Sequence, residues 1–326
     1  MFKKTFTRRA VLSMAGVMLA ATLGSAHAQT DSPLRIILPV GPGSGVDVIV
    51  RSAQNALSRA LGGQTVVVEN RPGAGGVIGT QALVKATADG NTIGVVSNNH
   101  AVNPSVYKDL PYDSLTDITP ITVVGGSPFI LVTNPAVPAT NAKELQALLK
   151  SRPGEINYAS SGNGTIIHLA GEMFLAEADV KARHIPYKGM GPMIVDILGG
   201  QVEMGVGALG AVLSQVENGT LRPIGIMGNA RIPSLPDVPT IAEQGFPGVD
   251  VAGWFAAVGP KGLPAEQVKR LHDAFVTAFN DPEVKEGFKR RNEFLMLNTP
   301  EEAADFFKSE QQRYADLIKK AGLPLN

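Results

Sequence analysis

The stretch INYASSGNGTIIHL, residues 156–169, changes character twice within a short span. Its first residues have the pattern of a buried strand, and its last residues begin an apolar helix. Between them lies a run of serines, glycines, an asparagine and a threonine, which is too polar for a core and too closely flanked by ordered elements for a linker. We therefore expect a small polar molecule to bind against this strand–loop–helix junction.

A second junction of the same kind occurs in ILPVGPGSGVDVIVR, residues 37–51. Here too a buried strand ends in a loop of glycine and serine, and a helix follows. Glycine allows the backbone to approach a ligand closely. The start of a helix offers unpaired N–H groups and a partial positive charge, which suit a carboxylate or a phosphate. The two junctions together predict a site for a small anion.

Outside the two junctions, short β-like runs alternate with amphipathic helical runs along most of the chain. This alternation predicts an α/β fold with a largely parallel sheet. Residues 118–134 read as two β runs separated by Gly125 and Gly126, and three helices close the chain after residue 264. Strands are expected at 34–40, 65–70, 92–97, 156–160 and 182–187, and the main helices at 46–61, 77–86, 141–150, 165–178 and 190–200.

The alternating pattern occurs as two similar series that meet near residue 130, and the chain returns to the first series near residue 249. We therefore expect two lobes, one made of residues 29–129 and 249–326 and the other of residues 130–248. Ligands of open α/β sheets bind beyond the carboxyl ends of the strands. A cleft between the lobes is thus the expected place for a ligand.

The first 28 residues have the composition of a secretory signal. Four basic residues and no acidic residue stand in the first ten positions, an apolar stretch follows, and small residues precede Ala28. This pattern predicts export to the periplasm, with cleavage after Ala28. The apolar stretch is shorter than the ~20 residues that span a membrane comfortably.

Charge and cysteine content narrow the class of partner. The full chain has 29 basic and 29 acidic residues, so removal of the signal leaves 25 basic and 29 acidic residues and a net charge of −4. The sequence contains no clustered Lys and Arg of the kind that binds nucleic acid or an anionic membrane. Because there is no cysteine, neither disulfides nor thiolate metal sites can form. We expect no nucleic-acid partner, no cofactor and no metal.

Several side chains at the junctions have more than one interpretation. Ser160, Ser161 and Thr165 can offer hydroxyl donors to a ligand, or they can simply cap the turn and the helix. His168 follows Thr165 by one helical turn, and it can donate to a ligand oxygen or pack as an ordinary helix histidine. Asp47 can cap its helix, orient the first loop or meet a ligand amine.

Motifs for catalysis and nucleotide binding are missing from the sequence, which has no G-x-S-x-G elbow, H-E-x-x-H pair or Walker loop. The glycines of ENRPGAGGVIG, residues 69–79, are spaced G-x-G-x-x-x-G and follow the second strand, which argues against dinucleotide binding. A secreted hydrolase that uses Ser161 or Thr165 with His168 is an alternative, although nothing places an acid to orient the histidine. We favour capture of a ligand without catalysis.

At these same motifs the chain resembles the Bug-type extracytoplasmic solute receptors of tripartite tricarboxylate transporters. LPVGPGSGVDVIVR (38–51) is similar to the first-loop pattern of that family, and VVVENRPGAGGVIG (66–79) is similar to its most recognisable motif. YASSGNGTIIHLAGEMF, IPYKGMGPMIVDILGGQVEM and LPDVPTIAEQGFPG match further motifs in the same order. The resemblance covers residues 33–326.

The resemblance implies a type II-like periplasmic binding protein whose two lobes, each a mostly parallel sheet flanked by helices, close on a small mono- or dicarboxylate. It also implies the membrane permease subunits of a tripartite transporter as partners, and we expect the receptor to be a monomer. The same fold acting as a ligand sensor for a signalling partner is an alternative. The residues that the resemblance assigns to the ligand are Gly41, Ser44, Gly45 and Asp47 in the first loop, and Ser160, Ser161, Gly164, Thr165 and His168 in the second.

Overall fold

The computed structural model describes residues 32–321. The expected secretory signal, residues 1–28 with cleavage after Ala28, lies outside these residues. Within residues 32–321, no helix is both long enough and apolar enough to cross a membrane.

The first βα series forms one group of parallel strands. Strand β1 pairs in parallel with β2 on one side and with β3 on the other. The elements of this group are β1 (Leu34–Leu38), α2 (Gly45–Ala60), β2 (Val66–Asn70), the 3-10 turn η1 (Ala74–Gly76), α3 (Val77–Val84), β3 (Thr92–Ser97) and α4 (Asn99–Val106).

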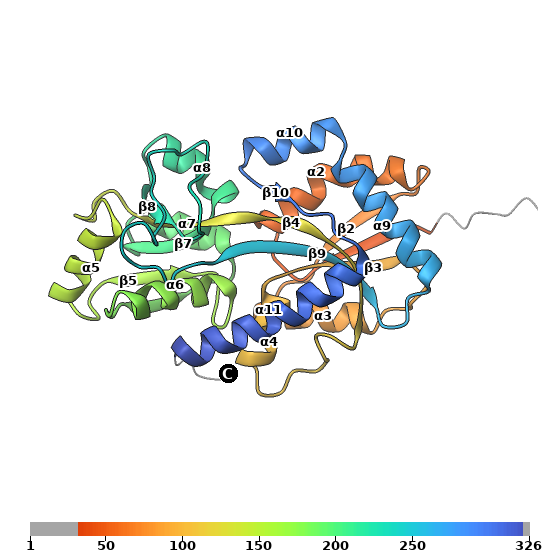
Figure 1. Ribbon diagram of the computed structural model, residues 1–326, viewed down its shortest axis with the longest axis horizontal. Helices are drawn as coiled ribbons and strands as arrows, with labels where there is room; N and C mark the ends of the chain where they lie inside the picture. The colour runs from red at the N-terminus through yellow and green to blue at the C-terminus, as the bar shows by residue number, and fades with distance from the viewer. Residues whose placement is uncertain (1–31, 322–326) are drawn as a thin grey trace, which may run out of the picture. The chain divides into compact units, whose positions relative to one another are not determined.

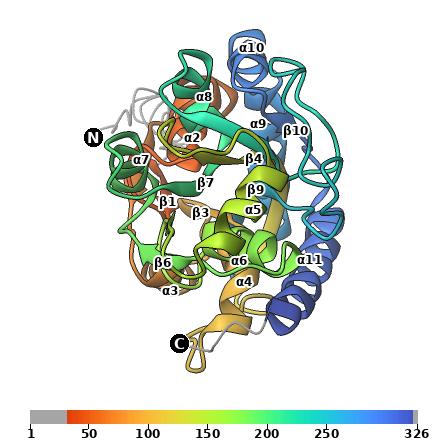
Figure 2. The ribbon, with the colours of Figure 1, turned by 90° about the vertical axis from the view of Figure 1, so that its left-hand side faces the viewer.

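The second βα series forms another group, in which β5 pairs in parallel with β6 and with β7. Helices α6 and α7 both contact β5 and β7, and Figure 2 shows this end of the sheet with its helices facing the viewer. The elements are α5 (Ala142–Ser151), β5 (Asn157–Ser160), α6 (Ile166–Glu177), β6 (Arg183–Pro186), α7 (Met190–Leu198), β7 (Met204–Ala208), α8 (Leu209–Glu217) and β8 (Arg222–Ile226).

Two long antiparallel strands, β4 (Ile118–Thr133) and β9 (Ala252–Pro260), join the two groups (Figure 1). The strand order is β2-β1-β3-β9-β4-β7-β5-β6, with β8 and the short strand β10 (Phe294–Leu295) also paired to β4. The α/β prediction is confirmed, but the sheet is mixed rather than largely parallel, because β9 and β4 run antiparallel to their neighbours. The division into lobes at residues 129–130 and 248–249 stays a prediction.

The prediction of two β runs split by Gly125 and Gly126 is wrong, because β4 continues through both glycines. A Cβ on Gly125 would lie 2.0 Å from the carbonyl oxygen of Phe294, and one on Gly126 would lie 2.2 Å from the carbonyl oxygen of Gly253. The glycines therefore allow β10 and β9 to approach β4 closely, and they do not interrupt the strand.

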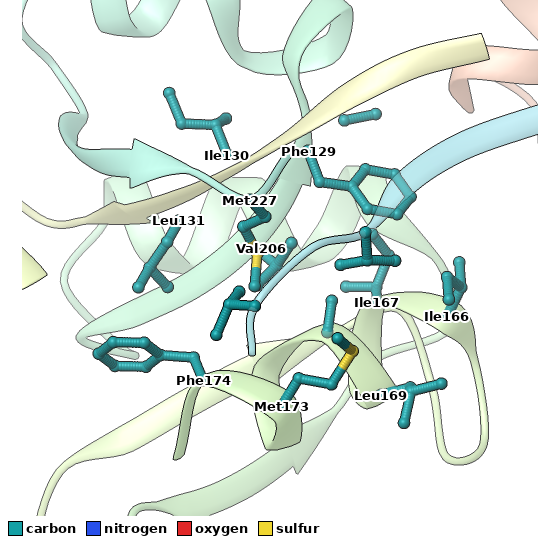
Figure 3. Packing of buried hydrophobic residues seen from close by; sticks show 14 of the residues in the cluster. Phe129, Ile130, Leu131, Ile166, Ile167, Leu169, Met173, Phe174, Val206 and Met227 are labelled. Atoms are coloured by element: carbon teal, nitrogen blue, oxygen red, sulfur yellow. The ribbon is translucent and has the colours of Figure 1, made fainter. Parts of the chain in front are cut away.

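Two hydrophobic cores lie on opposite faces of the sheet. Along β1, Ile36 and Leu38 belong to one core and Ile37 to the other, as the alternation of side chains in a strand requires. The core that contains Ile37 extends to the second series, where side chains from β4, α6 and β7 meet in Figure 3. The C-terminal elements that complete the fold are α9 (Ala265–Phe279), α10 (Pro282–Arg290), β10 (Phe294–Leu295) and α11 (Pro300–Ala321).

Candidate functional site

The first junction joins the buried strand β1 to α2, as the sequence predicts. Helix α2 begins at Gly45, and the extended residue Ser44 caps it, because its Oγ accepts a hydrogen bond from the N–H of Asp47 at 3.3 Å. The N–H of Ser44 in turn donates to the carbonyl oxygen of Gly41 at 3.3 Å. Ser44, rather than Asp47, is thus the capping residue of this helix.

Asp47 orients the first loop from behind. Its side chain is buried, and its Oδ2 accepts from the N–H of Gly43 at 2.9 Å. Its Oδ1 accepts from Nε of Arg51 at 2.8 Å and from Nδ2 of Asn70 at 2.9 Å. Burial alone would raise the pKa of Asp47, but these hydrogen bonds and the Arg51 charge hold that pKa below its ordinary value. The carboxylate therefore serves the loop, which is the second of the three roles that the sequence allowed.

Two backbone N–H groups at the start of α2 have no acceptor within residues 32–321. The first N–H groups of any helix lack partners inside the helix. The Oγ and the carbonyl oxygen of Ser44 accept from the N–H groups of Asp47 and Val48. No described group accepts from the N–H groups of Gly45 or Val46. Gly45 also lies close to the end of β7, since a Cβ built on it would be 3.9 Å from Cβ of Ala208. These N–H groups and the helix dipole suit an anion.

The second junction joins β5 to α6 through a loop that its own hydroxyls shape. Thr165 caps α6, because its Oγ1 accepts from the N–H of His168 at 3.3 Å, and it donates to the carbonyl oxygen of Gly162 at 2.8 Å. Ser161 donates to Oγ1 of Thr165 at 3.1 Å. Ser160 is fully buried, and its Oγ lies 3.1 Å from both the nitrogen and the oxygen of Gly162. All three hydroxyls therefore help to hold the loop.

His168 faces back toward this loop. The N–H of Gly164 donates to its Nδ1 at 3.1 Å, and its Nε2 lies 3.8 Å from Oε1 of Glu172. Burial lowers the pKa of His168, and the nearby Glu172 carboxylate opposes that effect. Within residues 32–321, no serine or threonine hydroxyl forms a hydrogen bond with a ring nitrogen of His168.

A third strand–helix junction, between β3 and α4, connects the two series. Asn99, the first residue of α4, accepts a hydrogen bond from the N–H of Ile166, the first residue of α6, at 2.8 Å. Asn99 also lines a small pocket at the carboxyl ends of β1 and β3, together with Pro39, Ser97 and Asn103. Within residues 32–321, no hydrogen bond or ion pair joins the first loop directly to the second. Asn99 thus brings the first series to the start of α6.

Sequence reasoning missed Asn70, Asn99 and His184. Asn70 ends one strand and Asn99 follows another, so a search for polar residues at the carboxyl ends of strands could have found both. His184 carries no such signal. Its Nε2 lies 2.6 Å from Oγ of Ser160, and this contact depends on the register in which β6 pairs with β5.

Positive charge at the two loops is either paired or exposed. Arg51 pairs with Asp47 and also donates to Oδ1 of Asn70 at 2.7 Å. Lys188 precedes Gly189, whose N–H bonds to the second loop, but the Lys188 side chain is exposed. In the described part of the chain, no group of three or more His, Asp and Glu side chains is arranged to hold a metal ion. An anion at these loops would therefore meet mainly N–H and O–H dipoles.

Comparisons with known proteins agree with this arrangement. The model of the tripartite tricarboxylate transporter family receptor matches residues 49–323. Protein BugT of Bordetella pertussis is 36% identical over 321 residues, which cover 97% of this chain and 98% of that protein. The solved periplasmic binding protein BugD is 32% identical with a TM-score of 0.86, and the alignment covers 90% of this chain and 99% of that one.

A further solved structure, R. palustris Rpa4515 with adipate, has a TM-score of 0.86 and 28% identity and covers 90% of this chain and 98% of that one. Both the family match and the relatives extend over most of the chain, and the family consists of solute-binding receptors. The chain therefore belongs to the family of tripartite tricarboxylate transporter receptors.

Proposed function

We propose that this chain is a periplasmic receptor that captures a small organic mono- or dicarboxylate and delivers it to the permease subunits of a tripartite transporter. The acid would lie between a lobe of residues 29–129 and 249–326 and a lobe of residues 130–248, which close over it. The signal-like residues 1–28 support export. The adipate in a solved relative with 28% identity supports a carboxylate as the ligand class.

The observation that carries this proposal is the pair of helix starts at the ends of buried strands. At α2, the N–H groups of Gly45 and Val46 have no acceptor within residues 32–321, and at α6 the same holds for Ile167. A hydrogen bond to a charged group contributes roughly 1.5–3 kcal/mol. A few such bonds, less the costs of desolvation and closure, are consistent with a micromolar affinity of about −8 kcal/mol.

Within this proposal the predicted site residues divide into two kinds. Those that would meet the carboxylate are Gly41, Ser44, Gly45 and Ser161, which are partly exposed, together with Gly164 and Thr165, which are buried at the start of α6. Those that would shape the loops from behind are Asp47, Ser160 and His168, whose side chains accept hydrogen bonds from the N–H groups of the loop glycines Gly43, Gly162 and Gly164.

A thermal-shift panel tests the ligand class. Adipate, succinate, benzoate and citrate represent the acids, and arginine, glucose and maltose represent cations and neutral sugars. We expect one or more acids to raise the melting temperature in a concentration-dependent way, since a ligand that binds only the folded state stabilises it. A shift with the sugars or with arginine, and none with the acids, would refute the proposal.

A matched pair of variants at Gly45 tests the role of the helix start. Proline is tolerated at the first helical position, and the preceding Ser44 already has the extended backbone that proline requires. Gly45→Pro removes one N–H donor and should weaken the binding of the acid about tenfold or more, whereas Gly45→Ala keeps the donor and should change it about threefold at most. Similar affinities for the two variants would exclude this N–H group as a ligand contact.

Delivery to a permease is tested in cells. Deletion of the gene should abolish uptake of the labelled acid, and expression of the wild-type chain, but not of Gly45→Pro, should restore it. Fractionation of the same cells should place the protein in the periplasm. Uptake that continues in the deletion strain, with loss only of acid-dependent gene regulation, would replace transport by sensing.

A further inference from the structure

His168 and His184 form a stacked pair directly behind the second loop. Their rings, from α6 and β6, have centroids 4.0 Å apart and planes inclined by 4°. The ring of Tyr158, from β5, stacks on His184 with centroids 4.8 Å apart. The His168 side chain is only 13% exposed. The pair therefore belongs to the wall that supports the candidate carboxylate loop.

A hydrogen bond from the loop identifies the protonation state of His168. The N–H of Gly164 donates to Nδ1 at 3.1 Å, so Nδ1 carries a lone pair and the ring proton lies on Nε2. A protonated imidazole has an N–H on both nitrogens and cannot accept this bond. Gly164 has a φ of +68°, a left-handed conformation that favours glycine. The neutral ring thus holds the loop in a left-handed backbone shape that glycine adopts readily.

The surroundings of the pair favour neutral rings. The titratable groups that face it are Tyr158 from β5 and Glu172 from the next turn of α6, and the Tyr158 hydroxyl donates to the same Glu172 oxygen that lies 3.8 Å from Nε2 of His168. Within residues 32–321, no charged side chain of β7 or α11 forms an ion pair or hydrogen bond with either ring. Burial lowers the pKa of both histidines, and lowers that of His184 to about 4 with the help of repulsion from a charged His168.

We infer that His168 is a positioning residue for ligand capture, and that its protonation releases the Gly164 contact and loosens the hold of the second loop on the acid. This inference rests on the proposed function, because it concerns the same loop. Its consequence is a receptor that retains its ligand at neutral pH and releases it on acidification. His184 supplies the stacked neighbouring ring, and once His168 is charged a second charge on His184 is disfavoured, since two positive rings at this separation repel each other.

The first experiment needs no ligand. The amide signal of Gly164 and the ring nitrogens of His168 are followed by NMR between pH 8 and pH 4 in the full-length mature protein. In the wild type, Nδ1 should be unprotonated at neutral pH, and the Gly164 amide should shift with the same midpoint as the His168 ring. In His168→Asn, whose Oδ1 replaces Nδ1 as an acceptor but does not titrate, the amide should stay constant. A Gly164 amide that ignores the His168 titration would overturn the inference.

The second experiment measures binding of adipate by calorimetry at pH 7 and pH 4.5. In His168→Asn, the affinity changes between pH 7 and pH 4.5 only through the titration of adipate itself. The relevant quantity is therefore how much more affinity the wild type loses over this range than the variant loses. We expect an excess of fivefold or more. His168→Leu, which removes the acceptor, should bind more weakly than His168→Asn at pH 7. Parallel pH profiles for the wild type and His168→Asn would contradict the inference, as would equal affinities for the Asn and Leu variants.

Two more variants separate the effect of the pair from a general effect of histidine. His184→Phe keeps a stacked ring without a charge, and because His184 becomes charged only near pH 4, the midpoint should stay close to that of the wild type; loss of the pH dependence in this variant would assign the effect to His184 instead of His168. His272→Asn, on α9 outside the site, should leave the profile as in the wild type. If the wild type binds no acid at any pH, the proposed function fails. The Gly164 amide then still decides whether His168 positions the loop.

Discussion

The two strand–loop–helix junctions share one local plan but are held by different chemistry. In the first, the buried Asp47 carboxylate accepts three hydrogen bonds, one of them from Arg51, so a charge holds the loop. In the second, the neutral ring of His168 accepts from Gly164 and stacks on His184, so the loop is held without a charge. A carboxylate keeps its charge to a lower pH than that at which an imidazole becomes protonated. The two loops should therefore respond to acid in different ranges.

The packing behind the two junctions also differs. Behind the first, Gly79 of α3 faces the backbone of Pro39 and Arg71. Behind the second, Gly171 of α6 faces the ring of Tyr158. A backbone wall can move only with its strands, whereas a ring can shift a little within its site. The first junction is thus the more rigid of the two.

The largest expected effect is that of Gly79→Ala, which should lower the free energy of unfolding by about 3 kcal/mol. Its Cβ would lie 2.5 Å from the carbonyl oxygen of Arg71 and 2.7 Å from Cα of Pro39. In Gly171→Ala the new Cβ meets a Tyr158 ring carbon at 2.8 Å, and the loss should be about 1 kcal/mol. Both glycines lie in helices, so alanine gains the same helix propensity at each position. The difference between the two variants in urea denaturation therefore reports the packing. Equal losses would remove this distinction between the junctions.

The next effect is that of Asp47→Ala, which should lower the free energy of unfolding at pH 7 by about 2 kcal/mol. The pKa of Asp47 is lowered on folding, so its contribution is present above the ordinary value of 3.8 and is lost as the pH falls through the folded pKa. Urea denaturation from pH 7 to pH 2.5 should show the wild type and the variant converging at the acidic end.

Two comparisons sharpen the result for Asp47. Asp305→Ala, whose side chain is 80% exposed, should change stability by about 0.5 kcal/mol at most. His184 affects the free energy of unfolding in another pH range. Its folded pKa of about 4 lies below the ordinary 6.5, so the stability of the second junction falls as the pH drops from 6.5 to 4. An Asp47 effect that persisted unchanged at pH 2.5 would show that the charge does not hold the first loop.

The smallest effects concern the two helix caps. Thr165→Ala should lower the free energy of unfolding by about 1 kcal/mol, because its hydroxyl contacts three neighbours, and Ser44→Ala by about 0.5 kcal/mol, because its hydroxyl accepts one bond of 3.3 Å. Thermal unfolding measures both. Thr165→Ser keeps the hydroxyl and should recover most of the loss. The opposite order of the two alanine variants would show that hydroxyls matter more to the first loop than to the second.

Much of the local structure could be predicted from the sequence. Helix α2 was expected at 46–61 and spans Gly45–Ala60, and α6 was expected at 165–178 and spans Ile166–Glu177. Helix periodicity and capping residues act over a few neighbouring positions, so they can be read directly. The glycines at the centre of β4 misled the prediction, because the strands that approach them come from residues 252–260 and 294–295.

The candidate site was predictable only in part, for the same reason. The loops and their hydroxyls stand in consecutive positions, so their pattern was visible. The acceptor for the first N–H of α6 is Asn99, which lies 67 residues away, and the ring that stacks on His168 comes from the neighbouring strand β6. Neither partner could be chosen without knowing which strands pair and in which register.

Two buried strands that end in glycine- and serine-rich loops with capped helices could be recognised from the residues alone, because these features depend on contacts within one or two helical turns. The packing of the chain, in contrast, brings Asn70 to the same Oδ1 of Asp47 that Arg51 contacts from one helical turn away, and it stacks His184 on His168. Those contacts join residues from different strands and helices. Their geometry follows from how the chain packs around its two cores, and short-range pattern carries no information about that packing.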